Sequence, residues 1–302
     1  MEEKIFLARV AEQAERFDDM VQFLEEAINL KAGEDFTVDE RNLLSVGFKN
    51  LIGSQRGAIR TIGAIEQNPK YQKFGDSLAG YKARIEGELY DKCMQIVRIV
   101  KNKCLGLAKD DEGKAFFQKM IGDYYRYVAE SAKGSTLEEV KNGALEGYRQ
   151  AEQLSKSLHA CNPIRLGLAL NYSVFHYEVM NNHKKACELG EQALTDSLEK
   201  IDDVDEETFR DAKSIIELLK ENLSLWKEEE GDNAVEDLWA LTLNSVHYNF
   251  TQVLIFWYPA LFSILFSLHL TFHYTCINIK QPHFELTIKI KLFIINSCSK
   301  HN

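Results

Sequence analysis

The chain has 302 residues, of which 27% are charged, and a formal net charge of -10. This length suits one large domain or two small ones, and the acidic balance makes nucleic acid an unfavourable partner. The charge is uneven, because residues 1–238 hold 32 basic and 45 acidic side chains whereas residues 239–302 hold four lysines and one glutamate. We therefore interpret 1–238 as one domain and 239–302 as an atypical tail.

Residues 1–238 carry apolar side chains at helical spacing and no alternating β-branched runs. Thr37 and Glu40 form a capping-box pattern, and Pro163 suits the first turn of a helix. These signals predict an all-α, antiparallel array of about nine helices with short connections. The predicted segments are a first pair between residues 6 and 23, then 37–65, 76–107, 113–132, 137–158, 163–181, 184–200 and 206–228.

The cysteines of this domain, Cys93, Cys104, Cys161 and Cys187, are widely spaced and form no C-x-x-C pair. We therefore expect reduced thiols and predict neither a metal site nor a disulfide framework. The N-terminus is charged and helix-patterned and lacks the features of a signal peptide. A cytosolic protein without a cofactor is the expectation.

Basic and aromatic side chains gather at two places. Arg56 and Arg60 follow Lys49 by seven and eleven residues, so all three share one stripe of the 37–65 helix. Within the run Gly122–Tyr127, Arg126 offers a planar fork of donors that matches phosphate oxygens, and Tyr127 adds a phenolic donor. The alternatives are a solvated helix face for the first group and an aromatic core stripe for the second.

Two later helices each place an asparagine on an apolar stripe. Leu170 and Val174 share a face with Glu178, and Asn171 lies beside it. Ile215 and Leu218 lie in line with Asn222. An amide presents both a donor and an acceptor and so fits an extended peptide backbone. A satisfied core amide remains the alternative for either asparagine.

Five motifs in this order resemble the 14-3-3 family of phosphopeptide-binding adaptors: Ala11–Arg16, Arg41–Val46, Gly122–Tyr127, Arg165–Asn171 and Asn222–Trp226. The resemblance implies a cup of nine antiparallel helices. It also implies a dimer through the N-terminal helices and an extended phosphoserine or phosphothreonine peptide in each groove. Homo- and heterodimers both remain open.

The resemblance also assigns roles to residues. It implies that Arg60 supports a set of four residues that hold the phosphate. This set comprises Lys49, Arg56, Arg126 and Tyr127. It implies a groove lined by Lys119, Leu170, Asn171, Val174, Glu178, Ile215, Leu218, Asn222 and Trp226. It implies a dimer interface that includes Arg16, Asp19, Tyr81, Arg84 and Glu88, with opposite charges facing each other.

Several positions depart from the family pattern. Gln55 replaces a second arginine, and Ile59 replaces a tryptophan. Ala58 replaces a serine that is phosphorylated in some members, so we expect no control of dimerisation by phosphorylation there. Ile121 replaces a lysine, which predicts a slightly less basic groove. His176 replaces a tyrosine and is interpreted as a packing residue.

Motifs typical of helical enzymes are missing from the sequence. The Glu-x-x-His pairs of di-metal bundles are absent before His159, His176 and His183, as are H-E-x-x-H, Walker A and nucleophile-elbow motifs. These absences argue against an enzyme. A helical scaffold for unphosphorylated partners remains an alternative, because it would keep the fold without needing the phosphate-holding set.

The tail contains an uncharged run of 20 residues, Val253–Phe272. This length meets the criterion for a transmembrane helix, which would make the protein a tail-anchored variant. A gene-model artefact is the favoured interpretation, because the composition changes so sharply, and an appended segment without membrane function is the third. We expect a cytoplasmic protein that also enters the nucleus, with a membrane as partner only if the tail is real.

Overall fold

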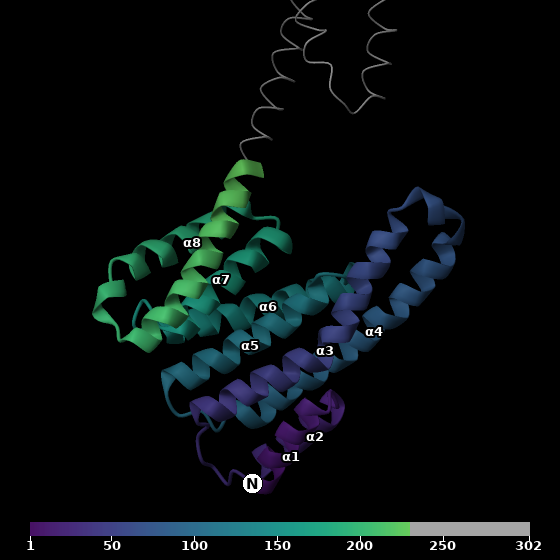
Figure 1. The fold of residues 1–302 in the computed structure, drawn as a ribbon. Helices are drawn as coiled ribbons and strands as arrows, with labels where there is room; N and C mark the ends of the chain where they lie inside the picture. Colours follow the sequence, from purple (N-terminus) through teal and green to yellow (C-terminus); the bar gives the residue numbers. More distant parts are fainter. Residues whose placement is uncertain (230–302) are drawn as a thin grey trace, which may run out of the picture. The chain divides into compact units, whose positions relative to one another are not determined.

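The computed structural model describes residues 1–229, and within them the predicted all-α fold is confirmed (Figure 1). A ninth helix over residues 206–229 follows eight α-helices in this part of the chain, which contains no strand. The eight helices are α1 (Glu2–Gln13), α2 (Phe17–Asn29), α3 (Val38–Glu66), α4 (Gly75–Ile99), α5 (Asp111–Ala129), α6 (Gly134–Ser155), α7 (Pro163–Glu178) and α8 (His183–Leu198).

Side-chain caps mark the starts of α3 and α7. Thr37 accepts a hydrogen bond from the Glu40 amide at 3.2 Å, and the Glu40 carboxylate accepts one from the Thr37 amide at 2.8 Å. This reciprocal pair satisfies two otherwise unpaired donors at the start of α3, as the capping-box pattern predicted. At the start of α7 the Asn162 side chain accepts hydrogen bonds from the amides of Ile164 and Arg165, and Pro163 lies in the first turn.

Three short helices were not predicted. η1 (Pro69–Phe74) and η3 (Ile201–Asp203) are 3-10 turns in connections. The predicted 76–107 helix instead changes at Ile99 into a π-helix, η2 (Val100–Cys104). Apolar periodicity does not distinguish hydrogen bonding to the fourth residue from hydrogen bonding to the fifth, so this change left no signal in the sequence.

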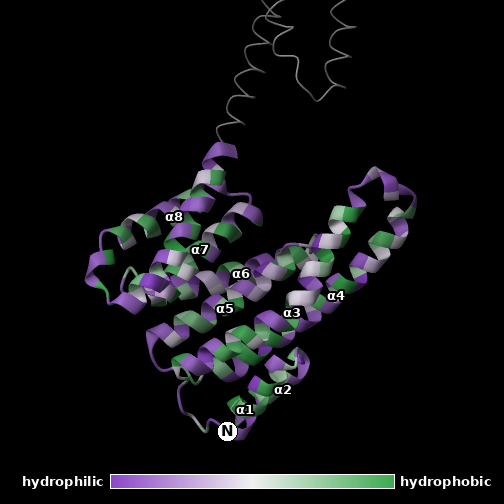
Figure 2. Ribbon diagram, in the orientation of Figure 1, coloured by the Kyte–Doolittle hydropathy of each residue, from purple (hydrophilic) through white to green (hydrophobic). Residues whose placement is uncertain are grey.

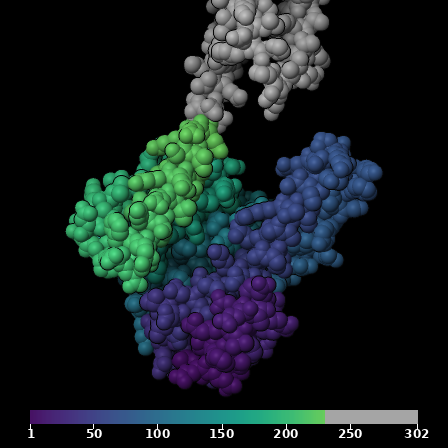
Figure 3. All heavy atoms as spheres, viewed as in Figure 1, coloured from purple at the N-terminus to yellow at the C-terminus, as the bar shows by residue number. Residues whose placement is uncertain are grey.

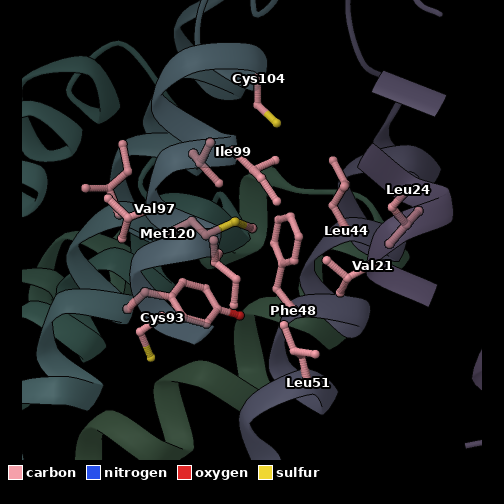
Figure 4. Packing of buried hydrophobic residues seen from close by; sticks show 14 of the residues in the cluster. Val21, Leu24, Leu44, Phe48, Leu51, Cys93, Val97, Ile99, Cys104 and Met120 are labelled. Atoms are coloured by element: carbon pink, nitrogen blue, oxygen red, sulfur yellow. The ribbon is translucent and has the colours of Figure 1, made fainter. Parts of the chain in front are cut away.

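The core lies between helices that follow one another along the chain. α1 packs on α2, α3 on α4, α5 on α6 and α7 on α8, and α4 joins the second and third pairs by packing on α5. The apolar faces of these helices turn inward (Figure 2). Phe48 of α3 is fully buried among apolar side chains that include Leu44 and Met120 (Figure 4).

α5 and α6 lie in close contact at Gly122 and Gly147. A Cβ on Gly147 would lie 2.8 Å from the backbone nitrogen of Gly122, and a Cβ on Gly122 would lie 2.7 Å from the ring of Tyr148. Real Cβ atoms essentially never come this close. The two glycines therefore allow the ring of Tyr148 to lie directly against α5, beside the predicted site residues.

The last described helix closes one side of a hollow. Leu219 packs with Leu166 of α7, and Leu223 packs with Ala186 of α8. Figure 3 shows a recess between this helix and the α3–α4 pair, with the later helices behind it. The predicted binding residues of α3, α5, α7 and this helix belong to the elements around the recess.

The chain divides into a unit of residues 1–228 and a remainder that begins at Glu229. No helix within residues 1–229 is long and apolar enough to cross a bilayer. The run Val253–Phe272 and the predicted boundary at residue 238 lie outside the described residues.

Candidate functional site

The basic stripe of α3 is present, and its three members differ in surroundings. Arg56 is half-buried, whereas Lys49 and Arg60 are exposed. Within residues 1–229, Lys49 forms no hydrogen bond or ion pair, and the Nε atom of Arg56 is buried without a partner. The stripe therefore retains donors that the described part of the protein does not use.

Arg126 is held inside the protein by a hydrogen-bonded network between α5 and α6. It is 7% exposed, and its Nε donates to the Tyr148 hydroxyl at 3.1 Å. That hydroxyl donates in turn to Oδ1 of Asp123 at 2.7 Å. Burial opposes ionisation of Asp123, but Lys119 and Arg126 outweigh it and hold the pKa of this carboxyl below its ordinary value. Arg126 is thus fixed by a buried network that runs through Tyr148 to Asp123.

Two predicted groove residues join the same network. The Lys119 ammonium lies 2.8 Å from Oδ2 of Asp123, and the Asn171 amide donates to Oδ1 of Asp123 at 2.8 Å. Asp123 thereby fixes the orientation of the Asn171 side-chain amide. The side-chain oxygen of Asn171 remains available to accept a hydrogen bond. Asp123 was not singled out as a site residue from the sequence, although it stands next to the aromatic run that contains Arg126.

Tyr127 links the two arginines. Its ring centroid lies 4.0 Å from the Arg56 guanidinium carbon and 4.6 Å from that of Arg126. Cation–π contacts of this kind hold guanidinium groups in place while leaving their edges free to donate. Burial raises the pKa of Tyr127, so its hydroxyl keeps its proton and remains a donor. The structure therefore brings together three of the four predicted phosphate-holding residues.

An open cavity of about 490 Å³ lies beside these side chains. Arg56, Arg60 and Tyr127 line it together with two carboxylates, Glu130 and Glu178. Partial burial and the charge of Glu130 raise the pKa of Glu178, against the opposing effect of the nearby arginines. Sequence reasoning did not identify Glu130, because nothing in its spacing shows that it reaches α3.

The predicted apolar wall forms where α7 meets the 206–229 helix. Leu170 and Ile215 pack against the same buried cluster, and Leu218 is 48% exposed. Asn222 is half-buried one turn after Leu218. Leu225 was not predicted but is 57% exposed at i+7 from Leu218, a spacing that would have identified it.

Two predictions for this region need adjustment. Trp226 is only 7% exposed and stacks on Tyr177 with ring centroids 4.6 Å apart, so it supports Val174 from behind the wall. Ile121 is 2% exposed in the core, so the prediction that its lack of charge makes the groove less basic was wrong. His176 is buried, and its ring centroid lies 4.8 Å from that of Tyr172, in agreement with a packing role.

The predicted dimer residues lie on α4 and at the start of α2. Within one chain, Arg16 pairs with Asp19 at 2.7 Å and Arg84 lies 3.9 Å from Glu88. The Arg84 guanidinium carbon also lies 5.0 Å from the ring centroid of Tyr81, which is 49% exposed. Both charged pairs are solvent-exposed and are available to exchange partners.

Cys93 and Cys104 are free thiols and are fully buried. Burial raises the pKa of each of these two thiols to about 12. Within residues 1–229, no group of three His, Cys, Asp or Glu side chains is arranged to hold a metal ion.

The fold and the site together define an all-α protein with a groove that carries a fixed arginine–tyrosine cluster at one place and an apolar wall at another. The family model for the 14-3-3 protein matches residues 7–227. The chain is 43% identical over 235 residues to 14-3-3 protein 3 of Entamoeba histolytica, covering 76% of this chain and 97% of the relative. It is 39% identical over 241 residues to 14-3-3 protein 5 of Solanum lycopersicum, covering 78% and 94%. The chain therefore belongs to the 14-3-3 family.

Proposed function

We propose that this protein is an adaptor that binds phosphoserine and phosphothreonine peptides of client proteins in its groove. The convergence of the Arg56 and Arg126 guanidinium groups on the ring of Tyr127 is the observation that supports this most directly. A phosphate monoester carries a charge of about -1.5 to -2 at pH 7 and three acceptor oxygens, so it needs several donors that are already in place. Binding would regulate the activity, location or interactions of the client.

Each part of the groove has a role in this proposal. Lys49 and Arg60 add charge to the Arg56–Arg126–Tyr127 cluster. Asn171, oriented by Asp123, and Asn222 would hydrogen-bond the backbone of an extended peptide. The partly exposed apolar side chains of α7 and the last described helix would contact the peptide's apolar residues: Leu170, Val174, Ile215, Leu218 and Leu225.

We further propose that two copies, or one copy and a related chain, join through α1, α2 and α4. Arg16 and Asp19 of one subunit would face Glu88 and Arg84 of the other. Exposed pairs contribute only about 0–1 kcal/mol each, so they would set the register while apolar burial supplies the affinity. Phe6 and Val10 on α1, which are 64% and 45% exposed, are candidates for that burial. We propose that the dimer acts in the cytoplasm and nucleus and has no enzymatic activity.

Replacement of Lys49 tests the phosphopeptide proposal against the scaffold alternative. Lys49→Glu should abolish binding of a fluorescent phosphoserine peptide, whereas a scaffold for unphosphorylated partners would bind as before. Lys184→Glu is the matched control, because Lys184 is 88% exposed on α8 and belongs to no part of the proposed groove. Equal binding of phosphorylated and unphosphorylated peptides by the unmodified protein would favour the scaffold.

A further inference from the structure

Glu130 receives more arginine contacts than any other described carboxylate. Its carboxylate accepts from Nη2 of Arg56 at 2.9 and 3.1 Å and from Nη1 of Arg126 at 3.3 Å. Nη2 of Arg60 lies 4.0 Å away. Glu130 therefore already takes up donors that an incoming anion would use.

The position of Glu130 is itself unfavourable for a negative charge. It is the C-cap of α5, where the helix dipole places partial negative charge. Glu178 adds a second carboxylate to the same cavity. The ion pairs with the arginines therefore stabilise the Glu130 carboxylate in this position.

The arginines do not depend on Glu130 in the same way. Arg126 is also held by Tyr148, and both guanidinium groups lie against the ring of Tyr127. Removal of the Glu130 carboxylate would thus free donors without removing the contacts that position them.

We propose that Glu130 is an internal anion that pairs with the arginines when no ligand is bound and competes with the ligand for them, an inference that rests on the proposed phosphopeptide function. A ligand carboxylate would replace the Glu130 carboxylate with a group of the same kind. Glu130 has the advantage in this competition, because it belongs to the same chain and so has a high effective concentration. A phosphate monoester offers more charge and a third oxygen, so it wins this exchange. Glu130 thereby excludes unphosphorylated acidic segments from the groove.

Three short peptides of one sequence test this, with phosphoserine, glutamate or serine at the central position. Their dissociation constants are measured by fluorescence anisotropy for the wild-type chain, Glu130→Gln and Glu178→Gln. Glu178 is the matched control, because it lies in the same cavity and forms no ion pair within residues 1–229. We expect Glu130→Gln to bind the glutamate peptide at least about tenfold more tightly than the wild type, which corresponds to about 1.4 kcal/mol.

The other outcomes separate the two proposals. If Glu130→Gln binds the glutamate peptide no more tightly, or if Glu178→Gln gains as much, the inference is overturned while the phosphopeptide function stands. If the wild-type chain does not prefer the phosphoserine peptide, the function itself falls. Should Glu130→Gln fail to fold, Glu130→Asp retracts the carboxylate by one methylene, and we expect it to gain part of the same affinity; no gain would overturn the inference.

Discussion

The Tyr148 hydroxyl of α6 lies between Asp123 and Arg126 of α5, donating to the first at 2.7 Å and accepting from the second at 3.1 Å. One phenolic oxygen thus connects the acid that orients Asn171 to the arginine proposed to hold phosphate. Tyr148 is fully buried, and burial raises the pKa of its hydroxyl well above the ordinary value, so this oxygen keeps its proton at neutral pH.

Replacement of Tyr148 by phenylalanine should cost both stability and binding. The change removes one donor and one acceptor from a buried network, and each buried polar group left unpaired costs about 1–3 kcal/mol. We expect a loss in this range in urea denaturation, together with weaker phosphopeptide binding in calorimetry. Tyr81→Phe removes a hydroxyl from an exposed ring and should leave the free energy of unfolding unchanged. An unaltered Tyr148→Phe protein would show that the network does not position Arg126.

A methyl group on Gly147 should separate α5 from α6. Its Cβ would lie 2.8 Å from the nitrogen of Gly122 and 3.1 Å from the carbonyl oxygen of Gln118, and backbone atoms cannot rotate away. Overpacking of this kind costs about 1–3 kcal/mol, so Gly147→Ala should lower the urea midpoint. At Gly53 of α3 nothing lies within 4 Å of the added Cβ, so Gly53→Ala should instead stabilise the helix by about 0.5–1 kcal/mol. Equal effects at the two positions would contradict the close packing.

The pattern of apolar residues was sufficient to predict the α-helices, because each packs one face on its neighbours in the chain. The stripe of Arg56 and Arg60 followed from helical geometry alone. Contacts between helices far apart in sequence could not be predicted in this way. Glu130 meets Arg56 across 74 positions, and Asp123 meets Asn171 across 48. The π-helix of η2 and the burial of Ile121 likewise depend on packing that periodicity does not encode.

His176 should make folding sensitive to mild acid. Both of its ring nitrogens are buried without a hydrogen-bond partner in the described residues, and burial, with Lys185 and Arg149 nearby, lowers its pKa from 6.5 to about 4. As the pH falls, His176 therefore takes up a proton in the unfolded chain before it does so in the folded protein. The stability that is present above pH 6.5 is lost as the pH falls towards 4. The loss reaches about 2–3 kcal/mol, at 1.36 kcal/mol per pKa unit.

His176→Phe should flatten this part of the pH profile of urea denaturation, because phenylalanine keeps the ring packing against Tyr172 and has no proton to bind. His183→Phe changes a less buried histidine on α8 and should leave the profile as in the wild type. A His176→Phe protein that still loses stability between pH 6.5 and 4 to the same extent would assign the acid sensitivity to other groups.

Charge reversal at Arg16 tests the proposed dimer and its register. Arg16→Glu would place like charges opposite Glu88 of the second subunit and also break the internal pair with Asp19, so we expect the dimer dissociation constant in analytical ultracentrifugation to rise. Glu88→Arg in the same chain would restore opposite charges across the interface but not the pair within the chain. Partial recovery of the dimer in the double variant would therefore report the contact between subunits, because the internal pair stays broken. Lys184→Glu should leave the dimer intact, and a double variant no more dimeric than Arg16→Glu would exclude this register.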